Sequence, residues 1–127
     1  MTKAYWHIHH DVLMEFLTEP IQKRIRYIER HKRKGEVRTR LRLLKPVKGK
    51  LPKSLVEAGV AYCAAWFAYW KSQVAKRRVP CDTLRDTYVK ALATGQPKLE
   101  ALHKLECLNC PWDGNTIFPT SKARRSH

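Results

Sequence analysis

A block of positive charge in the first half of the chain limits which residues can form a hydrophobic core. Fourteen of the 26 lysine and arginine residues in this 127-residue chain lie between Lys23 and Lys53, and only Glu29 and Glu36 lie among them. The segment therefore carries +12 of the formal net charge of +15. Such a block repels itself unless an anion lies against it, so it stays at the surface and predicts a polyanionic partner.

The rest of the composition fits one small domain. Hydrophobic residues make up 43% of the chain, which is enough for a modest core. No apolar run approaches the roughly 20 residues that span a bilayer, and the first residues lack the apolar stretch of a secretory signal. We therefore expect a cytoplasmic protein with no membrane partner. In a reducing compartment its four cysteines favour metal binding over disulfides.

Apolar periodicity predicts a mainly helical chain. The strongest helix is expected over about 55–78, where apolar and aromatic residues recur at three- and four-residue spacing. The aromatic residues of this stripe are expected mostly in the core, with an exposed partner surface as the alternative. Thr18 is expected to cap a helix over about 19–33. Further helices are predicted at 36–45, about 83–94 with Gly95 ending it, and about 97–106, with a basic loop at 46–53.

Two segments have an ambiguous period. Residues 5–9 fit a short strand, whereas Val12, Leu13, Phe16 and Leu17 have helical spacing. Segment 36–45 fits a helix or an alternating strand, and its length favours the helix. We predict one domain over residues 1–119 with four to five helices around a long central helix over 54–78. One short N-terminal strand and a zinc-knuckle-like turn at 103–119 complete it, and residues 120–127 form a disordered basic tail. Within 103–119, residues 112–115 are expected to form a tight turn.

A possible metal site is suggested near the end of the chain. His103, Cys107 and Cys110 have the spacing H-x3-C-x2-C, and the two cysteines match one half of a zinc knuckle. A closed structural zinc site needs four ligands. We predict His9 as the fourth ligand, with His7, His10 and Cys81 as alternatives. The competing interpretation is a pair of free thiols beside a surface histidine.

The basic segment predicts contacts with nucleic-acid phosphates. Arginine predominates from 23 to 45, which suits bidentate contacts, and Tyr27 is placed to stack on a base. A solvated charged face is the competing interpretation, but such faces usually mix both signs. The residues of this predicted surface are Lys23, Arg24, Arg26, Tyr27, Arg30, Lys32, Arg33, Lys34, Arg38, Arg40, Arg42, Lys48, Lys50 and Lys53.

One short motif superficially suggests catalysis. His7, His9, His10 and Asp11 read H-x-H-H-D, which is superficially similar to the metal-binding motifs of metal-dependent nucleases. Carboxylates are scarce elsewhere in the chain, so a full ligand set for a hydrolytic metal site is missing. We therefore favour histidines that satisfy hydrogen bonds in a packed N-terminal segment, and a protein that is not an enzyme.

Three segments together resemble a known family. These are YWHIHHDVL at the start, TRLRLLKPVKGKLP in the middle and EALHKLECLNCPWDGNTIFP near the end. In combination they are similar to a family of small hypothetical proteins from phages and prophages. The resemblance implies a mobile-element origin and action in the cytoplasm of a host cell. The family has no established activity, so the resemblance adds no catalytic role.

These observations favour a non-catalytic protein that binds RNA, DNA or a nucleoprotein through its basic segment. The first alternative is a phage inhibitor of a host defence complex, similar in action to an anti-CRISPR protein, that binds an effector or its guide RNA. The others are a metal-dependent nuclease and a structural protein of a virion or ribosome.

Overall fold

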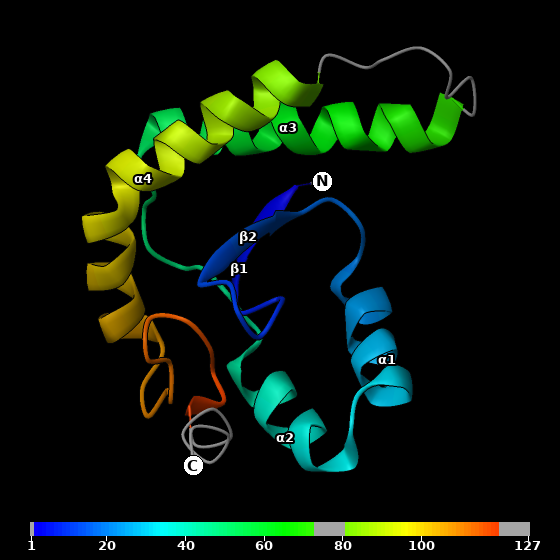
Figure 1. Ribbon diagram of the computed structural model, residues 1–127, viewed down its shortest axis with the longest axis vertical. Coiled ribbons are helices and arrows are strands. Elements are labelled where there is room, and N and C mark those ends of the chain that lie inside the picture. Colours follow the sequence, from blue (N-terminus) through cyan, green and yellow to red (C-terminus); the bar gives the residue numbers. More distant parts are fainter. Residues whose placement is uncertain (1, 73–80, 120–127) are drawn as a thin grey trace.

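The computed structural model describes residues 2–72 and 81–119 of the chain. These residues form β1 (Lys3–Trp6), β2 (Met14–Leu17), α1 (Ile21–His31), α2 (Lys34–Leu43), β3 (Lys45–Pro46), α3 (Lys53–Ser72) and α4 (Cys81–Glu106), as Figure 1 shows. The predicted mainly helical fold is confirmed at this level. The sheet is larger than expected, because three strands stand where one was predicted. None of the described helices combines the length and the apolar character needed to cross a bilayer.

The small sheet is antiparallel, with β1 in the centre between β2 and β3. Trp6 is paired with Met14 on one side and with Lys45 on the other. The prediction of helical spacing at 12–17 was wrong, because this segment pairs with β1 as β2. Residues 5–8 are all buried, since both faces of the central strand and the turn that follows it are covered.

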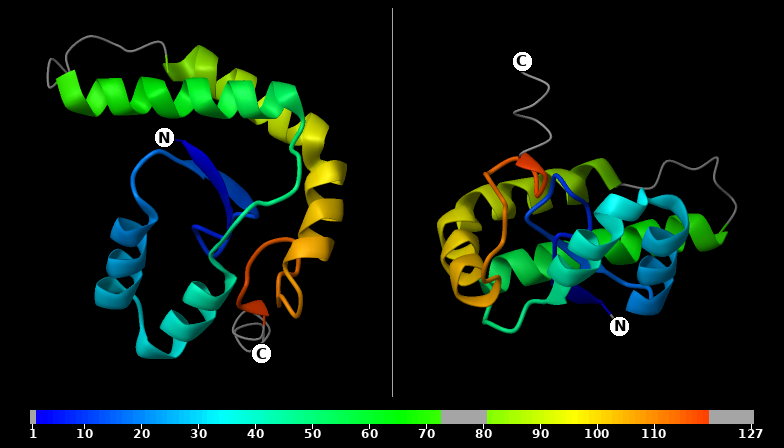
Figure 2. Two further views of the ribbon diagram at one scale, coloured as in Figure 1. Left: turned by 180° about the vertical axis from the view of Figure 1, so that it is seen from behind. Right: turned by 90° about the horizontal axis from the view of Figure 1, so that it is seen from below.

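The helices α3 and α4 cover the sheet from one side. The first half of α4 runs beside α3, and Figures 1 and 2 show this pair lying across the strands. The α3 backbone approaches β2 closely at Gly59, which faces the ring of Phe16. Phe16 also meets Tyr88 of α4 edge-on, with ring centroids 5.9 Å apart. Leu55 of α3 and Leu99 of α4 complete this core with Trp6.

The aromatic stripe of α3 is only partly in the core. Trp66 and Phe67 are 38% and 52% exposed, so their predicted burial was wrong. The side chains of Tyr69 and Trp70, and the end of the predicted helix at 73–78, lie outside the described residues.

One continuous helix replaces the two predicted over 83–94 and 97–106. Gly95 and Pro97 both lie inside α4. Gly95 does not end the helix, because it is buried where α4 packs on Pro52 and Leu55. Pro97 removes a backbone donor and bends the helix, and Figure 1 shows α4 changing direction near its middle. The bend carries Leu99 and His103 to the end of β1.

The basic helices α1 and α2 lie apart from the α3–α4 pair (Figures 1 and 2). The prediction of a helix within 36–45 is confirmed, but α2 begins already at Lys34 and ends at Leu43, and Lys45 belongs to β3. Thr18 does not cap α1, because Pro20 occupies the N-cap position and the hydroxyl of Thr18 contacts that of Thr2 at 3.2 Å. Ile28 anchors α1 and Leu43 anchors α2 in buried positions.

Glu106 fastens the end of α4 to two other segments. Its carboxylate accepts hydrogen bonds from the indole N–H of Trp6 at 3.1 Å and from the backbone N–H groups of Lys48 and Gly49 at 2.8 and 2.6 Å. Burial alone would raise the pKa of Glu106, but these hydrogen bonds and the charge of Lys48 lower it below its ordinary value. The carboxylate therefore joins α4, β1 and the loop before α3.

The chain beyond α4 returns toward β1 through a tight turn. Asp113 accepts hydrogen bonds from the N–H groups of Asn115 and Thr116 at 2.8 and 2.9 Å, and Gly114 has a φ of 101°. The predicted turn at 112–115 is thereby confirmed. The N–H of Ile117 donates to the carbonyl of His10 at 2.9 Å, which ties the C-terminal segment to the N-terminal one.

We expect Gly59→Ala to lower the free energy of unfolding by about 1–3 kcal/mol. An added Cβ would lie well inside van der Waals contact with the Phe16 ring, and overpacking of this kind outweighs the gain in helix propensity. Gly35→Ala in α2 is the matched control, because an added Cβ there meets no atom within 4 Å and should stabilise by up to about 1 kcal/mol. Urea unfolding measures both, and equal midpoints for the two variants would contradict the close packing of α3 on β2.

Glu106→Gln should lower the free energy of unfolding by about 1–2 kcal/mol, because an amide replaces one acceptor oxygen by a donor that faces backbone N–H groups. Glu100→Gln is the control, since Glu100 is exposed on the same helix and should change stability by less than about 0.5 kcal/mol. Both are measured by chemical unfolding with zinc present. Indistinguishable variants would show that the carboxylate does not join these segments.

Candidate metal centre

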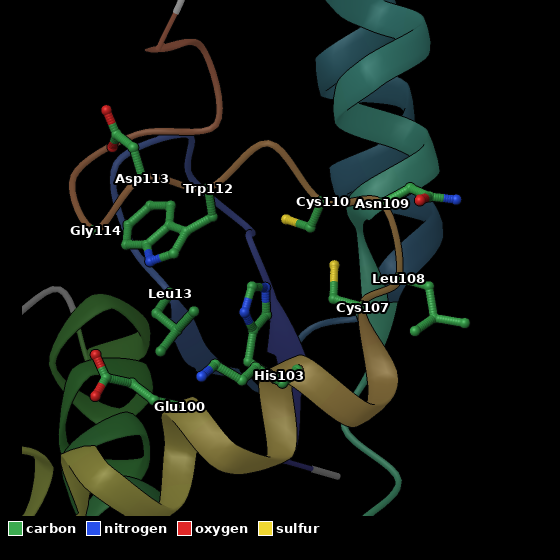
Figure 3. A pocket seen from close by; sticks show the side chains of 11 residues that line it. Leu13, Glu100, His103, Cys107, Leu108, Asn109, Cys110, Trp112, Asp113 and Gly114 are labelled. Carbon is green, nitrogen blue, oxygen red and sulfur yellow. The ribbon is translucent and has the colours of Figure 1, made fainter.

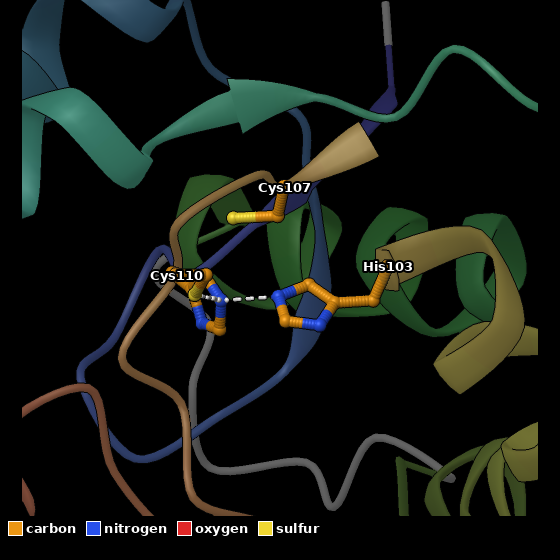
Figure 4. Close-up of side chains that lie close together, drawn as sticks. His103, Cys107 and Cys110 are labelled. Carbon is orange, nitrogen blue, oxygen red and sulfur yellow. Dashed lines mark hydrogen bonds between the residues drawn. The ribbon is translucent and has the colours of Figure 1, made fainter. Parts of the chain in front are cut away.

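Four side chains from three segments converge at one end of the sheet. His7 follows β1, His103 lies in the last turn of α4, and Cys107 and Cys110 lie in the turn after it. Their ligand atoms all lie within 4.8 Å of one another, which is close enough to bind a metal ion. Figure 4 shows both thiols and the His103 ring pointing into the same space.

The distances suit a tetrahedral ion. The Nε2 atoms of His7 and His103 are 3.0 Å apart, and Sγ of Cys110 is 3.3 Å from Nε2 of His7. Bond lengths of about 2.0–2.1 Å to nitrogen and about 2.3 Å to sulfur place tetrahedral ligands roughly 3.3–3.8 Å apart. The two contacts at Nε2 of His7 would lengthen by a few tenths of an ångström on binding an ion, and separations toward the 4.8 Å limit of the group would shorten to the same range.

The hydrogen bond behind His7 prepares its ring as a ligand. Nδ1 of His7 lies 3.2 Å from the carbonyl oxygen of Val12, which can only accept. Nδ1 therefore carries the proton, and Nε2 presents its lone pair toward His103 and Cys110. Such a partner behind the ligating nitrogen is typical of metal-bound histidine, where it fixes both the tautomer and the ring orientation.

The surroundings keep the histidines neutral. Burial, together with the charge of His103, lowers the pKa of His7 to about 4, although the hydrogen bond to Val12 acts in the opposite direction. Burial also lowers the pKa of His103. Trp6 packs against the His103 ring and Trp112 against the His7 ring, with centroids 5.3 and 5.2 Å apart. The cluster therefore offers two uncharged imidazoles in a largely apolar shell.

The two thiols bring the negative charge that a divalent ion needs. Burial, followed by the hydrogen bond and charge of Cys110, raises the pKa of Cys107. Lys45 and Arg42 act in the opposite direction and favour the thiolate. A bound cation would deprotonate both cysteines, and two thiolates would then balance a charge of +2.

Two residues of the cluster region have unusual backbone conformations. His7 has a φ of 52° and Asn109, between the two cysteines, a φ of 58°. Asn tolerates this left-handed region, whereas at His7 it costs about 1–2 kcal/mol. The N–H of His7 nevertheless donates to the carbonyl of Leu13 at 3.0 Å, so the turn after β1 is held in the form that aims the ring at α4.

A hollow beside the cluster connects it with solvent, and Figure 3 shows His103, Cys107 and Cys110 at its wall. Such an opening gives an ion a route to the ligands. The hollow is lined by Leu13, Glu100, His103, Lys104, Cys107, Leu108, Asn109, Cys110, Trp112, Asp113 and Gly114.

His7, and not His9, completes the group of four. His9 was predicted as the fourth ligand, but its Nδ1 lies 2.6 Å from Oε1 of Glu15 on the surface. His10, another alternative, contacts Thr116 at 3.2 Å, and the side chain of Cys81 lies outside the described residues. The sequence does carry a signal that distinguishes His7 from His9 and His10. Apolar residues flank His7 on both sides, namely Tyr5, Trp6 and Ile8, which is typical of a strand buried on both faces.

The H-x-H-H-D motif gathers no second metal group. His9 pairs with Glu15, His10 with Thr116, and Asp11 is exposed. Among residues 2–72 and 81–119, the only group of three or more potential metal ligands is the one formed by His7, His103, Cys107 and Cys110. The geometry therefore lends the nuclease hypothesis no support.

Most of the predicted basic surface is accessible, but two of its arginines have structural contacts. Arg40 is only 6% exposed, donates to Glu36 at 3.0 Å and lies over the ring of Phe118. Arg24 is half-buried and donates to the carbonyl of Ile8 at 3.0 Å. Burial removes Arg40 from the predicted phosphate-binding surface, whereas the half-buried Arg24 has one guanidinium nitrogen engaged in this internal contact. Lys32 is partly exposed. The exposed members are Lys23, Arg26, Tyr27, Arg30, Arg33, Lys34, Arg38, Arg42, Lys48, Lys50 and Lys53.

The exposed lysines and arginines of the 23–53 segment form no ion pair with another described residue. In the described part of the chain only two ion pairs form, between His9 and Glu15 and between Arg40 and Glu36. No exposed lysine or arginine of the 23–53 segment belongs to either pair. The charge that the sequence concentrates in this segment is thus left largely uncompensated on the folded surface.

Comparisons with models of protein families, with curated protein sequences and with solved structures find no match to this chain. Functional inference therefore depends on the chain's own geometry, and the resemblance to phage proteins stays a prediction.

We expect the chain to bind one tetrahedral divalent ion. His7→Ala and Cys110→Ala should each weaken zinc affinity by more than about tenfold, because each removes a ligand. His9→Ala is the matched control and should bind like the unchanged chain. The affinities are measured by titration with cobalt, monitored through the visible absorption of a tetrahedral cobalt–thiolate complex, and by competition of zinc for the bound cobalt. A loss of affinity in His9→Ala with none in His7→Ala would contradict the assignment.

Proposed function

We propose that this chain is a zinc-stabilised, non-catalytic nucleic-acid-binding protein that contacts phosphates through α1, α2 and the loop before α3. The observation that carries the proposal is the set of exposed cations on these segments, none of which belongs to an ion pair among the described residues. Each phosphate that such a cation neutralises releases condensed counterions, which favours binding without any base contact. Affinity should therefore depend steeply on salt, and sequence specificity should be low.

The donor set supports zinc as the metal. Two thiolates and two imidazoles in a tetrahedral arrangement are ligands typical of zinc, and hard cations such as magnesium prefer oxygen. Four protein ligands leave no open position for a substrate or a reactive water, so the role is structural. A small chain with a modest core gains much of its stability from such a metal centre.

The metal centre is connected to the basic surface through α2. Leu43 at the end of α2 packs with Cys107 and Ile117 in a small buried cluster. Arg42 donates to the carbonyl of Asn109, between the two cysteines, at 3.4 Å. Zinc at the four ligands would thereby fix the direction of α2 and preorganise its cations, which reduces the entropy lost on binding.

A second candidate function is inhibition of a host defence complex that itself contains nucleic acid. The observation that favours it is the exposure of Trp66 and Phe67 on α3, a helix that lies apart from the basic helices α1 and α2. Large aromatic residues are enriched in protein interfaces. A chain with a phosphate-binding surface and a separate aromatic surface suits a nucleoprotein partner, and a phage origin would suit this role.

Anisotropy titrations with labelled RNA, single-stranded DNA and duplex DNA at several salt concentrations test the main proposal. We expect binding at physiological salt with a steep log–log slope. The triple substitution Arg33→Ala, Lys34→Ala and Arg38→Ala should lower the slope by about 2–3, since each lost phosphate contact contributes about 0.7–0.9.

The matched control removes the same charge elsewhere. Arg85, Lys90 and Lys98 are exposed on α4, and their replacement by alanine should change the slope by much less. Equal effects of the two triple variants would mean that net charge, and not the α1–α2 surface, governs binding. Absence of binding to all three nucleic acids at physiological salt would overturn the proposal and leave the nucleoprotein inhibitor as the function to test.

A further inference from the structure

Tyr27 is the exposed aromatic residue at the centre of the basic helix α1. Its side chain is 44% exposed, although a tyrosine gains more by burying its ring. The ring lies on the outer side of a helix that is anchored on its inner side by Ile28. Figures 1 and 2 show α1 at the edge of the molecule, remote from the α3–α4 pair. A large ligand can therefore reach the exposed part of Tyr27.

Cations and a second ring surround Tyr27. The guanidinium carbon of Arg24 lies 4.8 Å and the ammonium of Lys32 5.4 Å from the ring centroid, and both lie over its face. The His31 ring is 4.7 Å away, tilted by 41°. Together Lys23, Arg26, Tyr27, Arg30 and His31 line a shallow hollow on the surface of α1.

This lining specifies the chemistry of a ligand. No acidic residue lines the hollow, and three of its five members are permanently cationic. Two aromatic rings offer faces for stacking, and the cations are spaced around them for phosphate contacts. A ligand that combines a flat π-system with phosphates on either side matches both features.

We propose that this hollow is a nucleotide subsite for single-stranded nucleic acid. One unpaired base stacks on His31 and on the exposed part of the Tyr27 ring that Arg24 and Lys32 leave uncovered, and the adjoining phosphates contact Lys23, Arg26 and Arg30. The inference rests on the proposed function and adds to it the strand state of the ligand. A duplex keeps its bases stacked inside the helix and cannot present a base face to Tyr27, so single strands bind more tightly.

The test uses the full-length, zinc-loaded chain and two single-stranded probes, a uridine 15-mer and a thymidine 15-mer, beside a 15-base-pair DNA duplex. Tyr27→Ala should weaken single-strand affinity by about 5- to 150-fold, the range expected for one lost base stack. Tyr27→Phe keeps the ring and should bind like the unchanged chain. Tyr27→Leu keeps apolar bulk without a π-face and should resemble Tyr27→Ala. Because Tyr27 is exposed, all three should retain the zinc content and thermal stability of the unchanged chain.

A probe with one 2-aminopurine in the single strand supplies a direct readout. Its fluorescence should be quenched on binding to the unchanged chain and to Tyr27→Phe, and not to Tyr27→Ala. Single-strand affinity and quenching that survive Tyr27→Ala, or equal affinity for duplex and single strand, would overturn the subsite and leave the phosphate-binding function intact. Binding only to phosphatidylserine vesicles, with none to the three nucleic acids, would overturn both.

Discussion

The meeting of His7 and His103 is the contact on which the arrangement of the chain depends. The two residues are 96 positions apart, and their ring nitrogens face each other at 3.0 Å inside the protein. One hydrogen bond joins the two neutral imidazoles, and Sγ of Cys110 lies 3.3 Å from the same nitrogen of His7, so a single acceptor is shared by two groups inside the protein. A divalent cation bound here would satisfy all four groups at once. It would also join the first strand to the last helix and to the turn beyond it.

From this centre the architecture follows in two directions. Toward α3, the bend in α4 at Pro97 permits one helix both to pair with α3 and to deliver His103 to the end of β1. Toward α2, Leu43 packs on Cys107 and Ile117, so the basic helices are attached to the same centre. Repulsion among their cations opposes compaction, and Arg40 and Arg24 offset part of it through buried contacts with Glu36 and Ile8.

Sequence patterns predicted the local structure correctly where contacts between neighbouring residues determine it. The helix over 34–43 and the turn around Gly114 depend on neighbouring residues, and both were predicted. The C-x2-C spacing likewise brought Cys107 and Cys110 together with His103. Prediction failed where distant packing overrides local preference: Phe16 is in a strand because β2 pairs with β1, and Gly95 is inside a helix because Pro52 and Leu55 pack against it. Propensities contain no information about such partners.

The sequence by itself determined the charge of the 23–53 segment, the mainly helical character and three of the four candidate ligands. These features depend on residue type and short spacing alone. Only the tertiary structure selected His7 over His9, because the choice depends on which of the two histidines after β1 lies next to His103 of α4. It likewise separated Arg24 and Arg40, which are held in internal contacts, from the exposed cations, since burial of a guanidinium is decided by the residues packed around it and not by its neighbours in the chain.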